Sequence, residues 1–298
     1  MKKSFLPALL LVLLLATAAY ADQRSWGTDA MVTTQIVDRT INDRAVEELP
    51  RQNVASGESY PVTVWASQSY QHITAREDGR KEGFRETQYV SLAGVDVHLP
   101  KLLAGISLGW VSIDGAGGFN NSNPTTAVAP IITPYVGMQL GDNVLVNVFY
   151  SHWELQERVS GNVNTHELRT NNAAGITAHY LLRFDNLLLD AHGGTRFAGS
   201  DARNEEIGQL AQWRAGLDMK YKWNSCTFLL GAEYVEDYRE YVGYDHRTDN
   251  YAKNEMAVRA GVDYALSDGL GLKFDANKSF LREKYTQYGA DLQLRYRF

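Results

Sequence analysis

Residues 287–298, QYGADLQLRYRF, end the chain with a strict two-residue alternation. Every even-numbered position from Tyr288 to Phe298 carries an apolar side chain, and every odd-numbered position carries Gln, Gly, Asp or Arg. Successive side chains of a β-strand point to opposite faces, so this stretch predicts a strand with one face for lipid and one for water. Charges on the second face would be costly in a soluble core, and a membrane β-barrel explains them better.

The same alternation recurs along most of the chain. Leu270, Leu272 and Phe274, for example, are separated by small or charged residues. The repetition predicts an all-β, twelve-stranded antiparallel transmembrane β-barrel. The expected strands lie near 61–72, 86–99, 101–113, 129–140, 143–154, 167–183, 186–198, 212–221, 227–234, 256–266, 270–279 and 287–298.

The connections between these strands alternate in length. Those after odd-numbered strands are long and polar, whereas those after even-numbered strands are tight and rich in turn residues. This alternation is typical of extracellular loops and periplasmic turns, and it places both barrel ends in the periplasm. The loops are expected at 75–86, 115–126, 156–166, 200–206 and 237–254, and the turns at 99–101, 141–142, 185–186, 224–225 and 267–269.

The first 21 residues have the order of a secretory signal. Lys2 and Lys3 precede an apolar run, and Ala19-Tyr20-Ala21 offers small residues for cleavage. The later sequence has no apolar run near the roughly 18 residues that a transmembrane helix needs. Beyond residue 21 the chain has 27 basic and 35 acidic residues, a formal charge of −8, which argues against a nucleic-acid partner. We expect export to the outer membrane.

Residues 22–60 lack the strand pattern. Their apolar residues recur at helical spacing and predict an amphipathic helix from about Asp29 to Leu49, ended by Pro50. Domains are therefore expected at 1–21 (signal peptide), 22–60 (helix and linker) and 61–298 (barrel). The sequence leaves open whether the helix is a lumen plug or lies in the periplasm. The apolar positions are Val32, Ile36, Val37, Ile41, Ala45 and Leu49.

Charged residues on the polar faces of the later strands are candidates to line the lumen. Their mixed signs favour interlocking salt bridges and a narrow or plugged interior over a selective channel. A barrel of about twelve strands is wider than its side chains fill, which leaves room for a helix or a narrow water path. The candidates are Arg214, Asp218, Lys220, Arg259, Asp263, Lys273, Asp275, Asp291 and Arg295.

Residues 61–298 resemble the β-domain of autotransporters, the translocator unit of type V secretion. The resemblance rests on VTVWA (62–66), Tyr89 through GVDVH (94–98), LAGISLGW (103–110) and GADLQLRYRF (289–298). It implies a twelve-stranded barrel threaded by a helix and linked to a passenger that moves to the cell surface. Here only residues 22–60 precede the barrel, so we expect little or no passenger, and Asn42-Asp43 within the helix is not an expected cleavage linker.

Tyr296 and Phe298 end the last strand. A C-terminal aromatic residue on an alternating strand resembles the signal that the barrel-assembly machinery reads in outer-membrane proteins. That machinery is therefore one expected partner, and outer-membrane lipid and lipopolysaccharide are the others. The sequence does not indicate which ligand, if any, the surface loops bind.

Two acid and histidine pairs share a strand face, Asp96 with His98 and Asp190 with His192. A carboxylate can orient a histidine as a general base, but no serine or recognised motif completes either pair. Polar lumen lining is the simpler interpretation, and we expect no catalytic site, no metal site and no cofactor. Ser151 and His152 fall on opposite faces of a strand, which is wrong for a nucleophile and its base. Asp245-His246 lies in a long loop, where loop charge is the simpler explanation, and Glu205-Glu206 lies in an acidic loop whose sequence alone does not supply a cation-binding geometry.

Three functions remain open at this point. The first is an autotransporter-like barrel that acts as a translocator, a surface-loop interaction protein or a structural component. The second is a small porin-like channel for ions or small solutes. The third, an outer-membrane hydrolase, is disfavoured because no catalytic set is complete, so we expect that the protein is not an enzyme.

Overall fold

The computed structural model describes residues 26–49, 62–75, 84–117, 123–159, 165–202, 205–242, 254–282 and 285–298. The expected signal peptide, residues 1–21, lies outside them. Among the described residues one helix precedes twelve strands. They are α2 (Trp26–Glu48), β1 (Val62–Ala75), β2 (Phe84–Leu99), β3 (Leu102–Gly117), β4 (Asn123–Gln139), β5 (Val144–Val159), β6 (Thr165–Phe184), β7 (Leu187–Ala202), β8 (Glu205–Trp223), β9 (Cys226–Val242), β10 (Asn254–Ala265), β11 (Leu270–Phe280) and β12 (Tyr285–Arg297).

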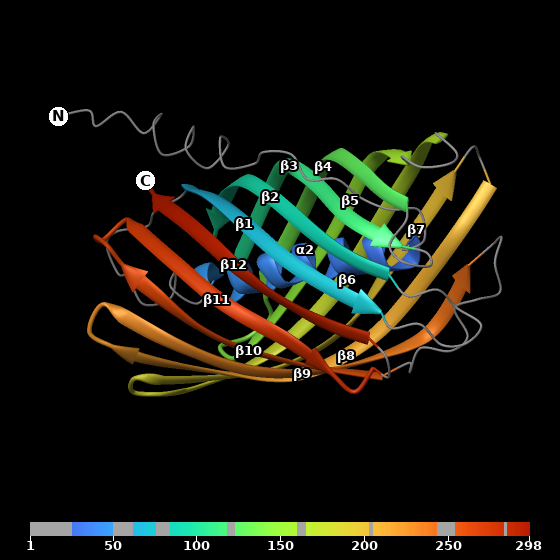
Figure 1. Cartoon of the computed structure of the whole chain (residues 1–298). Coiled ribbons are helices and arrows are strands. Elements are labelled where there is room, and N and C mark those ends of the chain that lie inside the picture. The colour runs from blue at the N-terminus through green and yellow to red at the C-terminus, as the bar shows by residue number, and fades with distance from the viewer. Residues whose placement is uncertain are drawn as a thin grey trace.

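The strands form one closed barrel (Figure 1). Each strand pairs antiparallel with its sequence neighbours, and β1 pairs with β12 from Thr63 opposite Arg297 to Ala75 opposite Tyr285. Closure leaves no strand edge unpaired, which satisfies the backbone groups that lipid cannot. The predicted twelve-stranded antiparallel fold is confirmed.

The outer surface of the barrel is apolar along the strands. Leu108, Leu217 and Phe274 are each more than half exposed although they are large apolar side chains. Their neighbours on the opposite face, including Ser107 and Asp218, are buried inside the barrel. This inversion of the soluble pattern is that of an outer-membrane barrel, with lipid around a polar lumen.

The tight turns lie where the sequence places them. Lys101, Asp185 and Asn224 adopt positive φ angles of 64°, 45° and 54° in the three turns that they occupy. Asp and Asn tolerate this left-handed backbone better than most residues, which explains two of these positions.

Several strands are longer at the loop end than the alternation predicts. β4 begins at Asn123 rather than near 129, β8 begins at Glu205 rather than near 212, and β9 continues to Val242 rather than ending near 234. The expected loops 115–126, 200–206 and 237–254 were therefore wrong in their bounds, because part of each range belongs to a strand. Backbone pairing continues beyond the segment that alternates, because strand hydrogen bonds do not require an apolar outer face.

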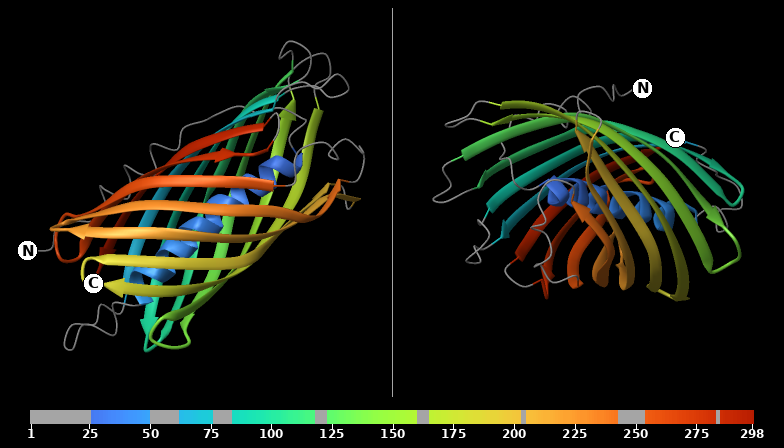
Figure 2. Two further views of the ribbon diagram at one scale, coloured as in Figure 1. Left: turned by 90° about the horizontal axis from the view of Figure 1, so that it is seen from below. Right: turned by 90° about the vertical axis from the view of Figure 1, so that its right-hand side faces the viewer.

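Helix α2 lies inside the barrel in every view (Figures 1 and 2). Its side chains from Ala30 to Leu49 are buried, apart from Arg39 and Glu47, which are partly buried. The sequence left open whether the helix lies in the lumen or in the periplasm, and in the structure it lies in the lumen. Among the described residues, no helix combines the length and hydropathy that a membrane span requires.

The direction of α2 follows from its contacts at the two ends. Thr33 Oγ1 lies 3.4 Å from Gln88 Oε1, near the long-loop end of β2. At the other end, a Cβ added to Gly137, which lies near the short turn after β4, would be 3.0 Å from Leu49 Cδ1. The helix thus runs from the loop end of the barrel to the turn end.

Candidate functional site

The lumen has an apolar half, formed mainly by β1 to β7. The apolar face of α2 belongs to the same buried cluster as the wall residues Trp65, Leu103, Leu145 and Phe149. Gly137 has no side chain where Leu49 and Ala45 of the helix approach. One face of the amphipathic helix is therefore buried as in a soluble core, and burial of each large side chain contributes about 1.5–3 kcal/mol.

The other half of the lumen is charged, and α2 presents acidic residues to it. Asp38 lies opposite two arginines: Arg196 Nη1 of β7 is 3.3 Å from Asp38 Oδ2, and Arg214 Nε of β8 is 3.0 Å from the same oxygen. Arg214 also donates to Glu233 on β9 at 2.5 Å. Helix and wall are thus joined by charge-assisted hydrogen bonds, which are stronger than neutral ones.

Asp43, five residues further along α2, meets three cations from three strands. Arg259 of β10 binds it in a bidentate manner, at 3.0 and 3.1 Å. Lys273 of β11 donates to Asp43, and Lys220 Nζ of β8 lies 3.8 Å away. Asp218 shares Arg259 with Asp43. A single helix carboxylate thereby links three of the four consecutive strands from β8 to β11.

The turn end of the helix has a similar arrangement. Glu47 Oε2 lies 3.1 Å from Arg295 Nη1, and Arg295 also pairs with Asp263 at 2.5 Å. Glu48 Oε1 lies 2.7 Å from Arg297 Nη2. Both arginines belong to β12, so the helix is tied to the strand that closes the barrel.

A buried network also joins α2 to the opposite wall. Arg44 donates through Nε to Asp96 of β2 at 2.9 Å, and its Nη1 donates to Glu48 at 3.2 Å. Asp96 also accepts hydrogen bonds from Trp65 Nε1, at 3.1 Å, and from Tyr135. The carboxylate is satisfied on all sides, as a buried charge must be.

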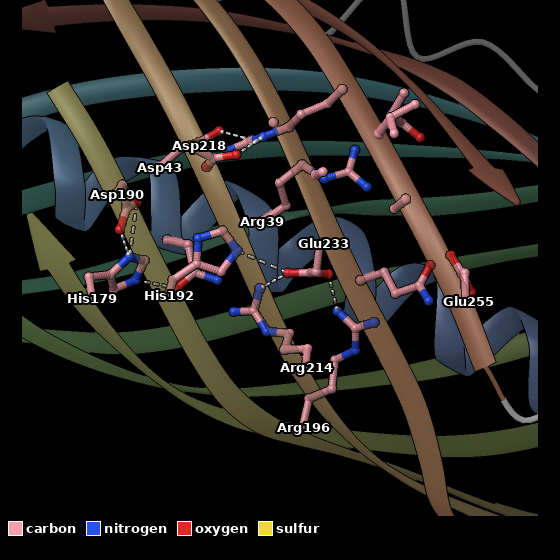
Figure 3. Close-up of a pocket in the computed structure, with 18 residues that line it drawn as sticks. Arg39, Asp43, His179, Asp190, His192, Arg196, Arg214, Asp218, Glu233 and Glu255 are labelled. Atoms are coloured by element: carbon pink, nitrogen blue, oxygen red, sulfur yellow. Dashed lines mark hydrogen bonds and ion pairs between the residues drawn. The ribbon is translucent and has the colours of Figure 1, made fainter. Parts of the chain in front are cut away.

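A cavity of about 50 Å³ lies between α2 and the wall formed by β6 to β11 (Figure 3). Arg196 and Arg214 meet Glu233 on one side of it, and His179 and His192 come from β6 and β7 on another. The cavity has room for a few water molecules.

The loop end carries its own ion pairs. Arg282, which follows β11, binds Asp237 at 2.9 Å and Glu255 at 2.9 Å. Burial alone would lower the pKa of Arg282, but these two carboxylates outweigh it and raise the pKa above its ordinary value. The guanidinium therefore stays charged and joins β9, β10 and the segment after β11.

All nine charged residues predicted to line the lumen point into the barrel. Six of them form ion pairs directly with α2: Arg214 with Asp38, Lys220, Arg259 and Lys273 with Asp43, Arg295 with Glu47, and Asp291 with Arg39. The other three pair with members of this set: Asp218 with Arg259, Asp263 with Arg295, and Asp275 with Lys273.

In the structure, the acid of each acid and histidine pair that the sequence suggested has another side chain as its nearest polar partner. Asp96 binds Arg44, while His98 Nε2 lies 3.0 Å from Thr63 Oγ1. Asp190 Oδ1 lies 3.0 Å from Nδ1 of His179, which belongs to the neighbouring strand.

The remaining polar clusters give no catalytic set among the described residues. Ser151 faces inward and bonds Thr133 at 2.7 Å, whereas His152 lies on the outer face beside Asn172. Asp245-His246 lies outside the described residues, as do the side chains of Glu205 and Glu206.

Sequence reasoning missed His179 and the central role of Glu233. His179 lies on β6 and, like the odd-numbered Asn171 and Thr177, its side chain faces the lumen. This strand was predicted, so the odd-numbered position of His179 could have indicated that it faces inward. What the sequence could not give was the register that sets His179 opposite His192.

No family model matches the chain, and no curated protein sequence matches it. Solved structures match it in fold. The translocator domain of the autotransporter NalP from Neisseria meningitidis gives a TM-score of 0.63 at 15% identity, covering 95% of this chain and 100% of that one. The β-domain of the Bordetella autotransporter BrkA gives 0.66 at 12% identity, covering 80% and 100%. An outer-membrane channel from Pseudomonas putida F1 gives 0.53 at 11% identity, covering 79% and 95%.

These similarities show a fold, that of an outer-membrane β-barrel. Both translocators and a channel have it, so the fold alone does not decide between them. The contents of the lumen are the feature that bears on the choice.

Proposed function

We propose that this chain is an autotransporter-like, translocator-type outer-membrane barrel, whose helix closes the lumen and holds the preceding segment at the outer face. The observation that carries the proposal is the direction of α2. Its N-terminal end lies at the loop end of the barrel, and its C-terminal end lies at the turn end. The proposal follows because a segment that enters α2 at this end reaches it from the outer mouth.

The ion pairs of α2 support a closed barrel over an open channel. Asp38, Asp43, Glu47 and Glu48 each pair with arginine or lysine side chains of the wall. An anion or cation pathway would need charges that face water, whereas these charges neutralise one another. The channel hypothesis therefore requires that the helix leave.

A hydrolase receives less support. The described residues place no serine or cysteine nucleophile beside the His179 and His192 rings; Ser151 bonds Thr133 elsewhere on the wall. We propose no enzymatic activity. The proposed partners are the surrounding outer-membrane lipid, lipopolysaccharide at the outer leaflet, and the barrel-assembly machinery during biogenesis.

The test is the location of the segment before α2 in living cells. An epitope tag inserted between Asp22 and Gln23 should be cleaved by protease added to intact cells. The same tag inserted between Asp185 and Asn186, in a short turn, should be cleaved only after the outer membrane is permeabilised. If the first tag also requires permeabilisation, the proposed direction of the helix and the translocator role are both wrong.

The closed state has a separate test. Purified full-length protein in a planar bilayer should show no steady current, because α2 occupies the lumen. A variant lacking residues 22–49, checked for its folded barrel by heat-modifiable migration, should conduct steadily. Steady conduction by the full-length protein would instead favour the channel.

A further inference from the structure

Three buried side chains on the lumen wall lie together although nothing in the proposed translocator role uses them. His179 comes from β6, and Asp190 and His192 come from β7, where His179 is the direct cross-strand partner of His192 (Figure 3). His179 and Asp190 are 3% and 2% exposed, and the His192 side chain is 7% exposed. One ligand-type atom from each lies within 4.8 Å of the other two.

The outer nitrogen of each ring has an oxygen to bind. His179 Nε2 lies 3.1 Å from Asn42 Oδ1, an oxygen that also accepts from Asn147 Nδ2 at 2.8 Å. His192 Nε2 lies 3.4 Å from the Glu233 carboxylate. Both contacts favour the tautomer with the proton on Nε2, so the lone pair of each ring is on Nδ1.

In this tautomer, neither Nδ1 lone pair has a hydrogen-bond donor to accept from among the described residues. His179 Nδ1 lies 3.0 and 3.1 Å from the two oxygens of Asp190, and a lone pair facing a carboxylate is repulsive. His192 Nδ1 is buried, and among the described residues it has no hydrogen-bond partner. A second proton on His179 would satisfy the first contact but would leave His192 Nδ1 unpaired. A cation between the three groups satisfies both.

We propose that His179, Asp190 and His192 bind a divalent transition-metal ion of the Zn²⁺ class, through the two Nδ1 atoms and the Asp190 carboxylate. Two imidazoles and a carboxylate suit zinc and its neighbours, whereas Ca²⁺ and Mg²⁺ prefer oxygen ligands. Ligand atoms about 2.1 Å from a metal lie roughly 3.0–3.4 Å apart, as His179 Nδ1 and Asp190 already do. The ligand atoms of the three residues lie within 4.8 Å of one another, so a rotation of the His192 side chain is the movement by which the third ligand would join.

The surroundings fit this assignment. Metal-bound histidines usually donate their other N–H to a carbonyl or a carboxylate, which are the roles of Asn42 and Glu233 here. The adjoining cavity leaves a position for a bound water. Because Asn42 belongs to α2, the ion would also couple the helix to the wall. The proposal does not depend on whether the protein is a translocator.

Metal binding is measured on purified full-length protein in detergent, stripped with a chelator and titrated with ZnCl₂ in a calorimeter. The wild type should bind one equivalent. His192→Asn and Asp190→Asn should each weaken binding by at least about tenfold to a hundredfold, because loss of even an outer-shell partner has that effect. His152→Asn is the matched control, since His152 lies on the outer face of β5, and it should bind as the wild type does.

A second readout concerns the wild type alone and does not depend on whether the variants fold. Co²⁺ in place of Zn²⁺ should give the visible absorption of a four- or five-coordinate nitrogen and oxygen site. The proposal is overturned if the wild type shows no saturable Zn²⁺ binding, if bound Co²⁺ has the spectrum of the hexa-aqua ion, or if both folded variants bind Zn²⁺ with unchanged affinity.

Discussion

Arg44 of α2 and Asp96 of β2 form an ion pair in which both side chains are fully buried. The pair lies on the apolar side of the helix, where Trp65 and Tyr135 also donate to Asp96. A buried ion pair adds little to the free energy of unfolding compared with apolar side chains of similar volume. Removal of one partner, however, leaves the other charge buried without a counter-ion. This relationship makes the position of the helix specific, because other placements in the lumen would leave Arg44 and Asp96 apart.

Replacing Arg44 should therefore destabilise the protein strongly. We expect Arg44→Met to lower the free energy of unfolding by about 3–5 kcal/mol, since Asp96 would remain buried without its partner. Urea titration of the barrel refolded in lipid vesicles gives the value. The double variant Arg44→Met/Asp96→Asn should recover most of the loss, and Arg183→Met, at an exposed position, should change little. An equal loss in the double variant would contradict this account.

Gly94 is the second position with a sharp expectation. A Cβ there would lie 2.5 Å from Cε2 and Cζ2 of Trp65, whose indole belongs to the Asp96 network. Gly94→Ala should lower the free energy of unfolding by about 1–3 kcal/mol, the usual effect of overpacking. Gly141→Ala is the control, because a Cβ at Gly141 has nothing within 4 Å. The same urea titration compares them, and equal stability of the two variants would count against a tight Trp65 pocket.

The strands were predictable because their signal is local. Two-residue alternation and turn residues such as Asp185-Asn186 depend on neighbours in sequence, so strand number and order followed directly. Strand ends at the loops were not predictable, since backbone pairing beyond the membrane leaves no hydropathy signal. β9, which continues to Val242, is the clearest case.

The lumen was predictable only in part. Parity shows that Arg259 and Lys273 face inward, but not that both bind Asp43 of the helix. That pairing depends on the position of α2 in three dimensions, and the helix sequence allowed the periplasm equally well. The cluster of His179, Asp190 and His192 likewise depends on the register between β6 and β7, which sequence alone does not fix.

Asp43 should control whether the lumen stays closed. Asp43→Asn removes the carboxylate shared by Arg259, Lys273 and Lys220, so these cations would draw water into the lumen and loosen the helix. In planar bilayers we expect brief current openings that the wild type lacks, with a preference for anions because the exposed charge is positive. Asp142→Asn, in an exposed turn, should remain as closed as the wild type. A silent Asp43→Asn trace would mean that other contacts hold the helix.

Phe298 should matter for assembly more than for stability. Phe298 packs edge-on against Tyr296 with ring centroids 4.7 Å apart, and its backbone N–H donates to Val62 O at 3.0 Å, which a substitution would keep. We expect Phe298→Ala to reduce the amount of folded barrel in the outer membrane of cells several-fold, while the purified variant refolds in detergent almost as well as the wild type. Heat-modifiable migration measures both. Leu281→Ala, an equally exposed apolar position near the loop end, is the control and should assemble normally. If both variants assemble equally, Tyr296 and Phe298 are not the signal that the assembly machinery reads. If refolding in detergent fails as badly as assembly in cells, the aromatic pair is a stabilising contact of the finished barrel instead.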